Sequence, residues 1–367
     1  MHKKIDSLYL HFPFCTHLCN YCDFYKKVPK NKETEIGQYQ SYLEDSFQVH
    51  NKLIESNGYS FAPLKTIYIG GGTPSLWGKM GKIFLENFFQ KNGLVFESEY
   101  EFTLEVNPGA WTEESLDAWR EFGVNRFSLG IQSYHSEMIK YLDRVHNLED
   151  VVDTLNYFSK HNLNFSVDFM LGLPFSENKR NILEELAEII KYNPSHFSVY
   201  ILTVKENYPF IKNLPSEEWI EQEFKSVSSF LLEKGFDHYE VSNFCLPGKH
   251  SVHNMNYWES KTVAAFGPSA TGFLAENKLR YKWKPNSPQF DLEELNESEY
   301  KLEEIYMALR SMKGLELDNL EPNFVEVLNS WEKRKIGKIT GGKFRLNSQG
   351  YLILDSLMNE LFSLKLL

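Results

Sequence analysis

Long apolar runs are absent from this sequence, and positive charge is scarce. No stretch of about 18 consecutive apolar residues occurs, so we expect no transmembrane helix. The 39 Lys and Arg residues are outnumbered by 50 Asp and Glu, and the net charge of −11 argues against general nucleic-acid binding, which needs clustered cations. The first residues, MHKK, lead directly into a predicted strand rather than an apolar signal segment.

Cysteine is also scarce, with four residues in a chain of 367. Three of them fall in one short segment, and this odd number, with nothing that points to secretion, argues against the disulfide framework of a secreted domain. We therefore expect a reducing, cytoplasmic environment. The fourth, Cys245, has no partner nearby in the sequence, and we expect it to be a buried thiol.

The segment CTHLCNYC places Cys15, Cys19 and Cys22 at C-x3-C-x2-C spacing, directly after a predicted strand. Thiolates are the ligands of iron–sulfur clusters, and a four-iron cluster with three cysteines would leave one iron open to another ligand. The alternative is a zinc site completed by His11 or His17. Structural zinc sites more often use two ligand pairs separated by a longer loop, so the spacing favours the cluster.

Strand-like and helix-like segments alternate over the first two thirds of the chain. Helix-like segments lie between strands, and Thr112 with Glu113 and Glu114 forms a typical helix start. Six such repeats predict an α/β fold, a partial TIM-like (β/α)6 barrel whose ligand site lies at the carboxyl ends of the strands. The predicted strands are residues 8–12, 66–69, 101–106, 126–131, 165–170 and 196–202.

The pattern loosens beyond residue 240. We predict a barrel over residues 1–240, an irregular segment with a linker over 241–290, and a small helix-rich C-terminal domain of winged-helix type over 291–367. The linker is expected at residues 284–288, where two prolines flank Asn and Ser.

Polar residues stand where the predicted strands end. The run Gly70-Gly71-Gly72-Thr73 follows the second strand, and three glycines allow a ligand to approach the backbone closely, although a plain tight turn remains an alternative. For Glu105, Gln132 and Asp168, which end other strands, the alternative is a polar residue with a purely structural role. For Arg144 the alternative is a surface salt bridge. Together these residues predict one polar site facing the cysteines.

His253 opens the motif HNxxYW within the irregular segment. A histidine beside large aromatic residues has the chemistry of an axial haem ligand with rings that pack on the porphyrin. A structural loop histidine is the alternative, and His250 is a neighbouring competitor.

The cysteine spacing and the strand-end motifs resemble the radical-SAM family that contains oxygen-independent coproporphyrinogen III oxidases and haem chaperones of the HemW type. The matching motifs run in family order from residue 8 to about 272. They include LYLHFPFC, IGGGTPS, EVNP, GIQS, Asp168 with GLP, and GPSA.

The resemblance implies that Cys15, Cys19 and Cys22 bind a 4Fe-4S cluster and that S-adenosylmethionine (SAM) chelates the open iron. It also implies a set of SAM contacts and, for His253 in HNxxYW, a contact with haem. The implied SAM contacts are Tyr9, Gly71, Gly72, Thr73, Glu105, Gln132, Arg144 and Asp168, with Tyr21 packing beside the cofactor.

Two features favour the chaperone branch over the oxidase. The oxidase pattern has a further cysteine two residues after the third, where this chain has Phe24, and the HNxxYW motif is associated with the chaperones. The resemblance therefore implies a haem chaperone that passes haem to an acceptor such as a respiratory haem protein, with no residue assigned as catalytic. The alternatives are an oxygen-independent coproporphyrinogen III oxidase of porphyrin biosynthesis, or a radical-SAM enzyme with another substrate.

Overall fold

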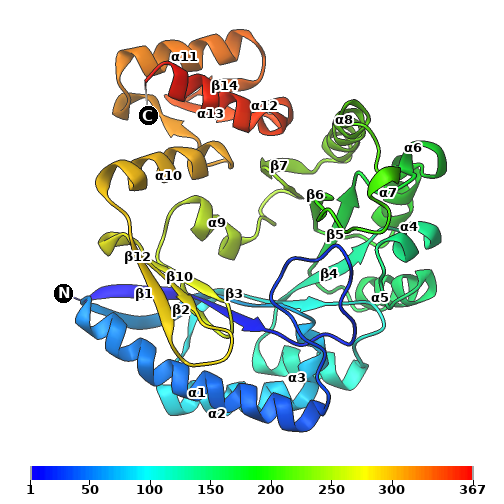
Figure 1. The fold of residues 1–367 in the computed structure, drawn as a ribbon, viewed down its shortest axis with the longest axis vertical. Coiled ribbons are helices and arrows are strands. Elements are labelled where there is room, and N and C mark those ends of the chain that lie inside the picture. Colours follow the sequence, from blue (N-terminus) through cyan, green and yellow to red (C-terminus); the bar gives the residue numbers. More distant parts are fainter. Residues whose placement is uncertain (1, 366–367) are drawn as a thin grey trace.

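A curved nine-stranded sheet forms the centre of the computed structural model, which describes residues 2–365 (Figure 1). The strand order is β7-β8-β6-β5-β4-β3-β2-β1-β9, and β1 to β6 pair in parallel in chain order. All six predicted strands are therefore confirmed. The strands are β1 (Lys3–Phe12), β2 (Tyr59–Gly71), β3 (Phe96–Val106), β4 (Arg126–Gln132), β5 (Phe165–Leu171), β6 (His196–Ile201), β7 (Asp237–Glu240), β8 (Asn243–Cys245) and β9 (Ala264–Phe266).

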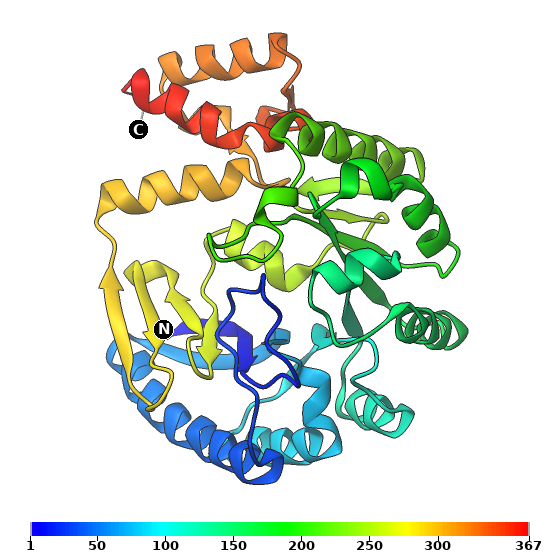
Figure 2. The same ribbon diagram turned by 45° about the vertical axis from the view of Figure 1, so that its right-hand side comes forward.

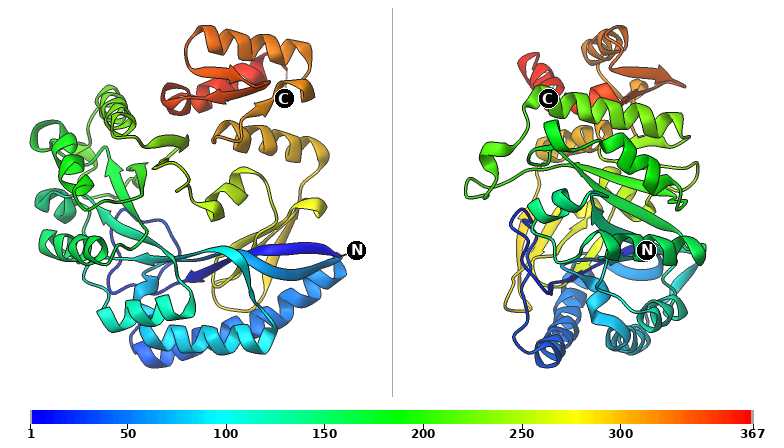
Figure 3. Two further views of the ribbon diagram at one scale, coloured as in Figure 1. Left: turned by 180° about the vertical axis from the view of Figure 1, so that it is seen from behind. Right: turned by 90° about the vertical axis from the view of Figure 1, so that its right-hand side faces the viewer.

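Helices cover the outer face of this sheet (Figure 3). The predicted start of one helix is confirmed, because Thr112 accepts a hydrogen bond from the Ser115 backbone N–H in a capping box. The helices of this layer are α1 (Lys32–Ser56), α2 (Gly78–Asn92), α3 (Glu113–Phe122), α4 (Ser136–Tyr141), α5 (Leu148–Lys160), α6 (Ser176–Lys179), α7 (Ile182–Ile190) and α8 (Glu217–Glu233).

The segment 241–290 is not irregular, contrary to the prediction. It contributes β8 and β9 to the large sheet, and most of its buried hydrophobic residues, such as Phe244, Phe266 and Tyr281, belong to the same core as the barrel. Its strands are only three to five residues long, which is too short to produce a readable period. The predicted linker is the turn between two paired strands. The further elements here are α9 (Val252–Trp258), β10 (Thr271–Leu274), β11 (Leu279–Trp283) and β12 (Phe290–Glu294).

The C-terminal part has its own hydrophobic core, which includes Trp331, Phe344 and Leu357. Its three-stranded sheet has the order β13-β15-β14, as expected for a winged-helix type of domain. The boundaries at residues 240 and 290 stay predictions. The elements are α10 (Glu297–Leu309), β13 (Leu315–Glu316), α11 (Pro322–Lys333), β14 (Gly337–Thr340), β15 (Lys343–Leu346), α12 (Ser348–Leu352) and α13 (Leu354–Ser363).

None of the helices within residues 2–365 combines the length and the apolar character that crossing a membrane requires. The described residues also form four short 3-10 turns: η1 (Pro74–Trp77), η2 (Ile211–Asn213), η3 (Ala275–Asn277) and η4 (Leu317–Asn319).

Candidate functional site

Two adjoining cavities, of about 260 Å3 and 420 Å3, lie where the carboxyl ends of the strands meet the cysteine loop. In Figure 2 this loop, in dark blue, crosses in front of the strands. The smaller cavity is lined by all three cysteines of the loop, and the larger one by Glu105, Gln132 and Asp168. Gly71, Gly72 and Arg144 line both, so the structure brings most of the predicted residues together.

Cys15, Cys19 and Cys22 are free thiols in the loop that follows β1. Cys15 is buried, and its sulfur accepts a hydrogen bond from the Thr73 hydroxyl at 3.6 Å. Three thiols beside one cavity, with no fourth cysteine in the loop, match the donor set of a cluster that leaves one iron open.

The zinc alternative loses support from the surroundings of its proposed fourth ligands. His11 Nε2 lies 2.8 Å from the Tyr25 carbonyl oxygen, and His17 Nε2 lies 2.8 Å from Asp143 Oδ2. Cys245 lies in β8 and is buried, as predicted.

The glycine run packs directly against the cysteine loop. The Gly72 N–H donates to the Phe12 carbonyl oxygen at 2.7 Å, and a Cβ at Gly72 would lie 2.5 Å from the Phe14 oxygen. Gly71 has a φ of 116°, which a residue with a side chain rarely adopts, and its N–H donates to Glu105 Oε2 at 3.0 Å. The glycines are thus required for the close approach of β2 to the loop, and their contact with a ligand stays a prediction.

Glu105 and Asp168 are two partly buried carboxylates that line the larger cavity. Glu105 accepts a hydrogen bond from the Tyr68 hydroxyl at 2.9 Å, and Asp168 accepts one from the Ser128 hydroxyl at 3.0 Å. Burial, together with the charge of Asp168, raises the pKa of Glu105 to about 7, and burial raises the pKa of Asp168 to about 6. Such carboxylates favour a ligand that brings hydroxyl donors or a positive charge, as the ribose and ammonium groups of SAM do.

Arg144 reaches the site from the connection after α4. Its Nη2 donates to Asn107 Oδ1 at 2.7 Å and to the Gly130 carbonyl oxygen at 2.9 Å, and its Nη1 donates to the Tyr21 hydroxyl at 3.3 Å. These partners are neutral, so the alternative of a surface salt bridge is wrong. A guanidinium held in this way fits the carboxylate of SAM.

Tyr9 and Gln132 differ in how they relate to the cavities. Gln132 lines the larger cavity and has a φ of 65°, an uncommon conformation outside glycine. Tyr9 lines neither cavity, and its hydroxyl lies 3.1 Å from His11 Nδ1. Its contact with SAM stays a prediction.

His253 lies on the short helix α9 and not in a loop. Its side chain is 1% exposed, with Nδ1 2.9 Å from the Thr66 hydroxyl and Nε2 3.5 Å from the Tyr257 hydroxyl. Burial, reinforced by the charge of Arg126, lowers the pKa of His253 to about 3. The histidine is therefore neutral, as an iron ligand must be.

His253 lines neither cavity, but one residue connects it to the larger one. The ring of Tyr68 lies 5.3 Å from the His253 ring, and the Tyr68 hydroxyl binds Glu105. The backbone N–H of His253 donates to Glu101 at 2.9 Å, which fixes α9 to β3. Haem ligation by His253 stays a prediction.

Sequence reasoning missed four residues at the site. Tyr68 and Ser128 share the inner face of the sheet with Glu105 and Asp168, and the period of two along their strands was a usable signal. Asn107 belongs to the motif EVNP, in which Glu105 alone was predicted to lie at the site. Tyr200 lines the larger cavity at the end of β6, where no motif marks it.

Comparisons with known proteins agree on the family. The profile of the Radical SAM superfamily matches residues 9–187. The haem chaperone HemW of Lactococcus lactis is 30% identical, with 88% of this chain and 86% of the relative covered. HemW of Escherichia coli is 32% identical, with coverage of 72% and 69%.

A solved structure, that of the coproporphyrinogen III oxidase HemN of Escherichia coli, shares the fold. The TM-score is 0.75, with 98% of this chain and 89% of that chain covered. At 19% sequence identity this likeness concerns the fold alone, and it confirms the predicted barrel with a small C-terminal domain.

Proposed function

This chain belongs to the radical SAM superfamily and to its HemW family, and from that premise we propose that it is a cytoplasmic haem chaperone. The observation that carries the proposal is the placement of His253. It packs against Tyr68, which in turn binds Glu105, so the HNxxYW helix adjoins the predicted SAM site.

The residues present fit a 4Fe-4S cluster and SAM. Cys15, Cys19 and Cys22 would hold three irons, and Arg144 would bind the carboxylate of SAM at the fourth. Glu105 and Asp168 would accept hydrogen bonds from its ammonium and ribose groups, as their burial and raised pKa values favour. When bound, the cluster and SAM supply one-electron chemistry.

Haem would be bound through His253 Nε2. The contact between Nδ1 and Thr66 holds the imidazole ring, while the Tyr257 hydroxyl lies in front of Nε2. Tyr257 is 36% exposed, and its side chain would have to turn aside to admit the iron. The haem would then pass to an acceptor, for which a respiratory haem protein is our proposal.

The experiment that tests the haem site compares His253→Ala with His250→Ala. Both proteins are purified in full length, loaded with haem, and passed through a desalting column. We expect His253→Ala to lose haem, with the Soret band absent or shifted, and His250→Ala to retain it. Equal retention by both variants would remove His253 from the site.

The different-class alternative is an oxygen-independent coproporphyrinogen III oxidase, whose fold this chain shares. Phe24, which is 69% exposed, stands where the oxidase pattern has a further cysteine. This difference favours the chaperone. Anaerobic incubation with coproporphyrinogen, SAM and a reductant discriminates between the two, because only the oxidase releases CO2.

A further inference from the structure

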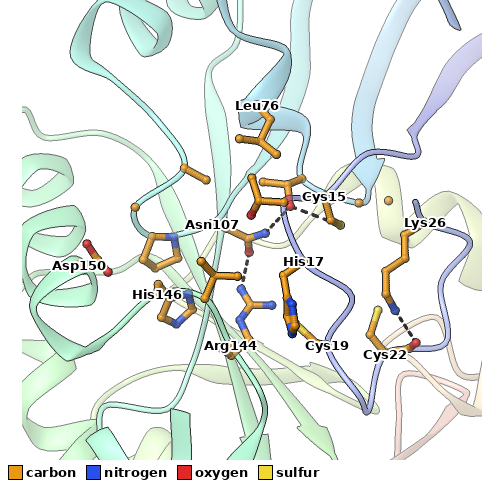
Figure 4. A pocket seen from close by; sticks show the side chains of 18 residues that line it. Cys15, His17, Cys19, Cys22, Lys26, Leu76, Asn107, Arg144, His146 and Asp150 are labelled. Atoms are coloured by element: carbon orange, nitrogen blue, oxygen red, sulfur yellow. Dashed lines mark hydrogen bonds between the residues drawn. The ribbon is translucent and has the colours of Figure 1, made fainter. Parts of the chain in front are cut away.

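Asn107 connects Arg144 with Thr73, two residues of the site that belong to separate sequence motifs. Its Oδ1 accepts from Arg144 Nη2 at 2.7 Å, and its Nδ2 donates to the Thr73 hydroxyl at 2.9 Å. That hydroxyl donates in turn to Cys15 Sγ at 3.6 Å. Figure 4 shows the side chain of Asn107 between Arg144 and Cys15, joined to its partners by dashed lines.

The local sequence holds this side chain in place. Asn107 directly follows β3 and precedes Pro108, and a residue before proline is confined to extended backbone. The neighbouring strand leaves space for it as well, because a Cβ at Gly130 would lie 2.5 Å from Asn107 Oδ1. Gly130 has no side chain that would displace the amide.

We propose that Asn107 is a positioning residue that sets both the guanidinium of Arg144 and the hydroxyl of Thr73. Through Arg144 it orients the group that binds the carboxylate of SAM. Through Thr73 it directs a hydrogen bond to a cluster thiolate, and such bonds tune the reduction potential of a cluster. The inference rests on the proposed function, because it takes the cluster and SAM as the bound groups.

A side-chain amide carries an acceptor oxygen and a donor NH2 group on neighbouring atoms, so Asn107 can accept from Arg144 and donate to Thr73 at once. The charge on Arg144 makes its bond to Oδ1 the stronger of the two, since hydrogen bonds to charged groups contribute more than neutral ones. Loss of that bond should therefore weaken SAM binding by about tenfold or more.

The first experiment is a double-mutant cycle on the full-length protein, reconstituted anaerobically with iron and sulfide. SAM affinity is measured from the change in the electron paramagnetic resonance spectrum of the reduced cluster. We expect Asn107→Ala to weaken SAM binding by about tenfold alone but by less than about twofold in an Arg144→Met background. An equal loss in both backgrounds, or none in either, would overturn the proposal.

Gly130→Ala provides a second route if Asn107→Ala does not retain the cluster. The added methyl group should displace the Asn107 amide and reproduce the loss of SAM affinity. The matched control is Asn92→Ala. In the wild type, the Asn92 amide donates to the Phe88 carbonyl oxygen within α2, away from the site. Normal SAM affinity in Gly130→Ala would contradict the proposal.

Asn107→Asp and Thr73→Val together test the link to Cys15, because Thr73→Val removes the hydroxyl without adding a charge. A carboxylate accepts from both partners, so the Thr73 hydroxyl would turn toward Asp and away from Cys15. We expect a more negative midpoint potential of the cluster without SAM, as measured by redox titration. An unchanged potential would exclude the link to Cys15. A wild-type protein that holds no cluster would instead contradict the proposed function itself.

Discussion

Glu105 is the side chain whose protonation should matter most for the site. It is partly buried, its pKa is affected by the charge of Asp168, and it accepts hydrogen bonds from the Tyr68 hydroxyl and the Gly71 N–H. Its pKa is raised to about 7, so near neutral pH it is divided between the charged and the neutral form. A ligand that brings positive charge and hydroxyl donors should shift it to the charged form.

SAM affinity should therefore depend on pH through Glu105. Because the folded-state pKa lies near 7, affinity should increase as the pH rises from 6 to 8 and level off above that. Glu105→Gln should bind SAM more weakly at pH 8 and show a flatter profile. Equilibrium binding at several pH values measures this, with exposed Glu114→Gln as the control. If SAM affinity in Glu105→Gln depends on pH as steeply as in the wild type, the pH dependence comes from another group.

Thr66 should support the fold through His253. Thr66→Val removes the hydroxyl that pairs with His253 Nδ1 and leaves this buried nitrogen without its partner. The free energy of unfolding should fall by about 1–3 kcal/mol. Urea unfolding measures the change, and Thr66→Ser, which keeps the hydroxyl, serves as the control. If Val and Ser variants prove equally stable, the contact contributes nothing.

The helix α9 depends on a contact from outside its own sequence. It is seven residues long, too short to be stable alone, and Glu101 of β3 accepts hydrogen bonds from the N–H groups of Val252 and His253. Arg126 lies 3.9 Å from the same carboxylate. The motif HNxxYW is thus placed by the barrel and not by local propensity.

Removal of that contact should loosen α9. In Glu101→Ala, the amides of Val252 and His253 should exchange with solvent about tenfold faster or more, because the start of the helix loses its acceptor. Hydrogen–deuterium exchange with mass spectrometry measures this in the peptide that contains α9. Glu99→Ala, an exposed position on the same strand, is the matched control, and unchanged protection in Glu101→Ala would show that α9 needs no such anchor.

Whether an element could be predicted depended on its length and on how close in the sequence its pairing partners lie. Strands β1 to β6 carry buried apolar runs, and glycine and polar residues mark the ends of several of them, so the barrel and the residues at its strand ends were readable. The strands β8 to β11 have only three to five residues, and β9 pairs with β1 at the other end of the barrel sequence. The burial of His253 depends on Thr66 and Tyr257 together, and no local pattern predicts that.

At the scale of the whole molecule, the C-terminal domain contacts the barrel close to α9. The Val241 N–H donates to the Arg310 carbonyl oxygen at 2.8 Å, and the Arg310 guanidinium lies 5.1 Å from the ring of Trp258. Glu240 is fully buried at this junction, and its Oε1 has no partner among residues 2–365. The end of the HNxxYW motif therefore contacts the second domain.

Stability should decrease with rising pH because of Glu240. Burial raises its pKa to about 8, so the folded protein holds this proton more tightly than the unfolded chain does. The free energy of unfolding should fall as the pH rises from about 4.5 to 8. Glu240→Gln should be more stable than the wild type at pH 8.5, by more than about 1 kcal/mol. Thermal unfolding at pH 6 and 8.5 measures this, with exposed Glu326→Gln as the control, and a wild-type-like response in Glu240→Gln would contradict the assignment.

The central claim, a haem chaperone with a SAM-binding cluster, is tested most directly by one anaerobic titration. The reconstituted protein receives haem, and the spectrum and stoichiometry are recorded; coproporphyrinogen, SAM and a reductant then follow, and tetrapyrroles are quantified. Our account predicts stable haem binding without decarboxylation. Conversion of coproporphyrinogen to protoporphyrinogen would contradict it and would identify the chain as an oxidase.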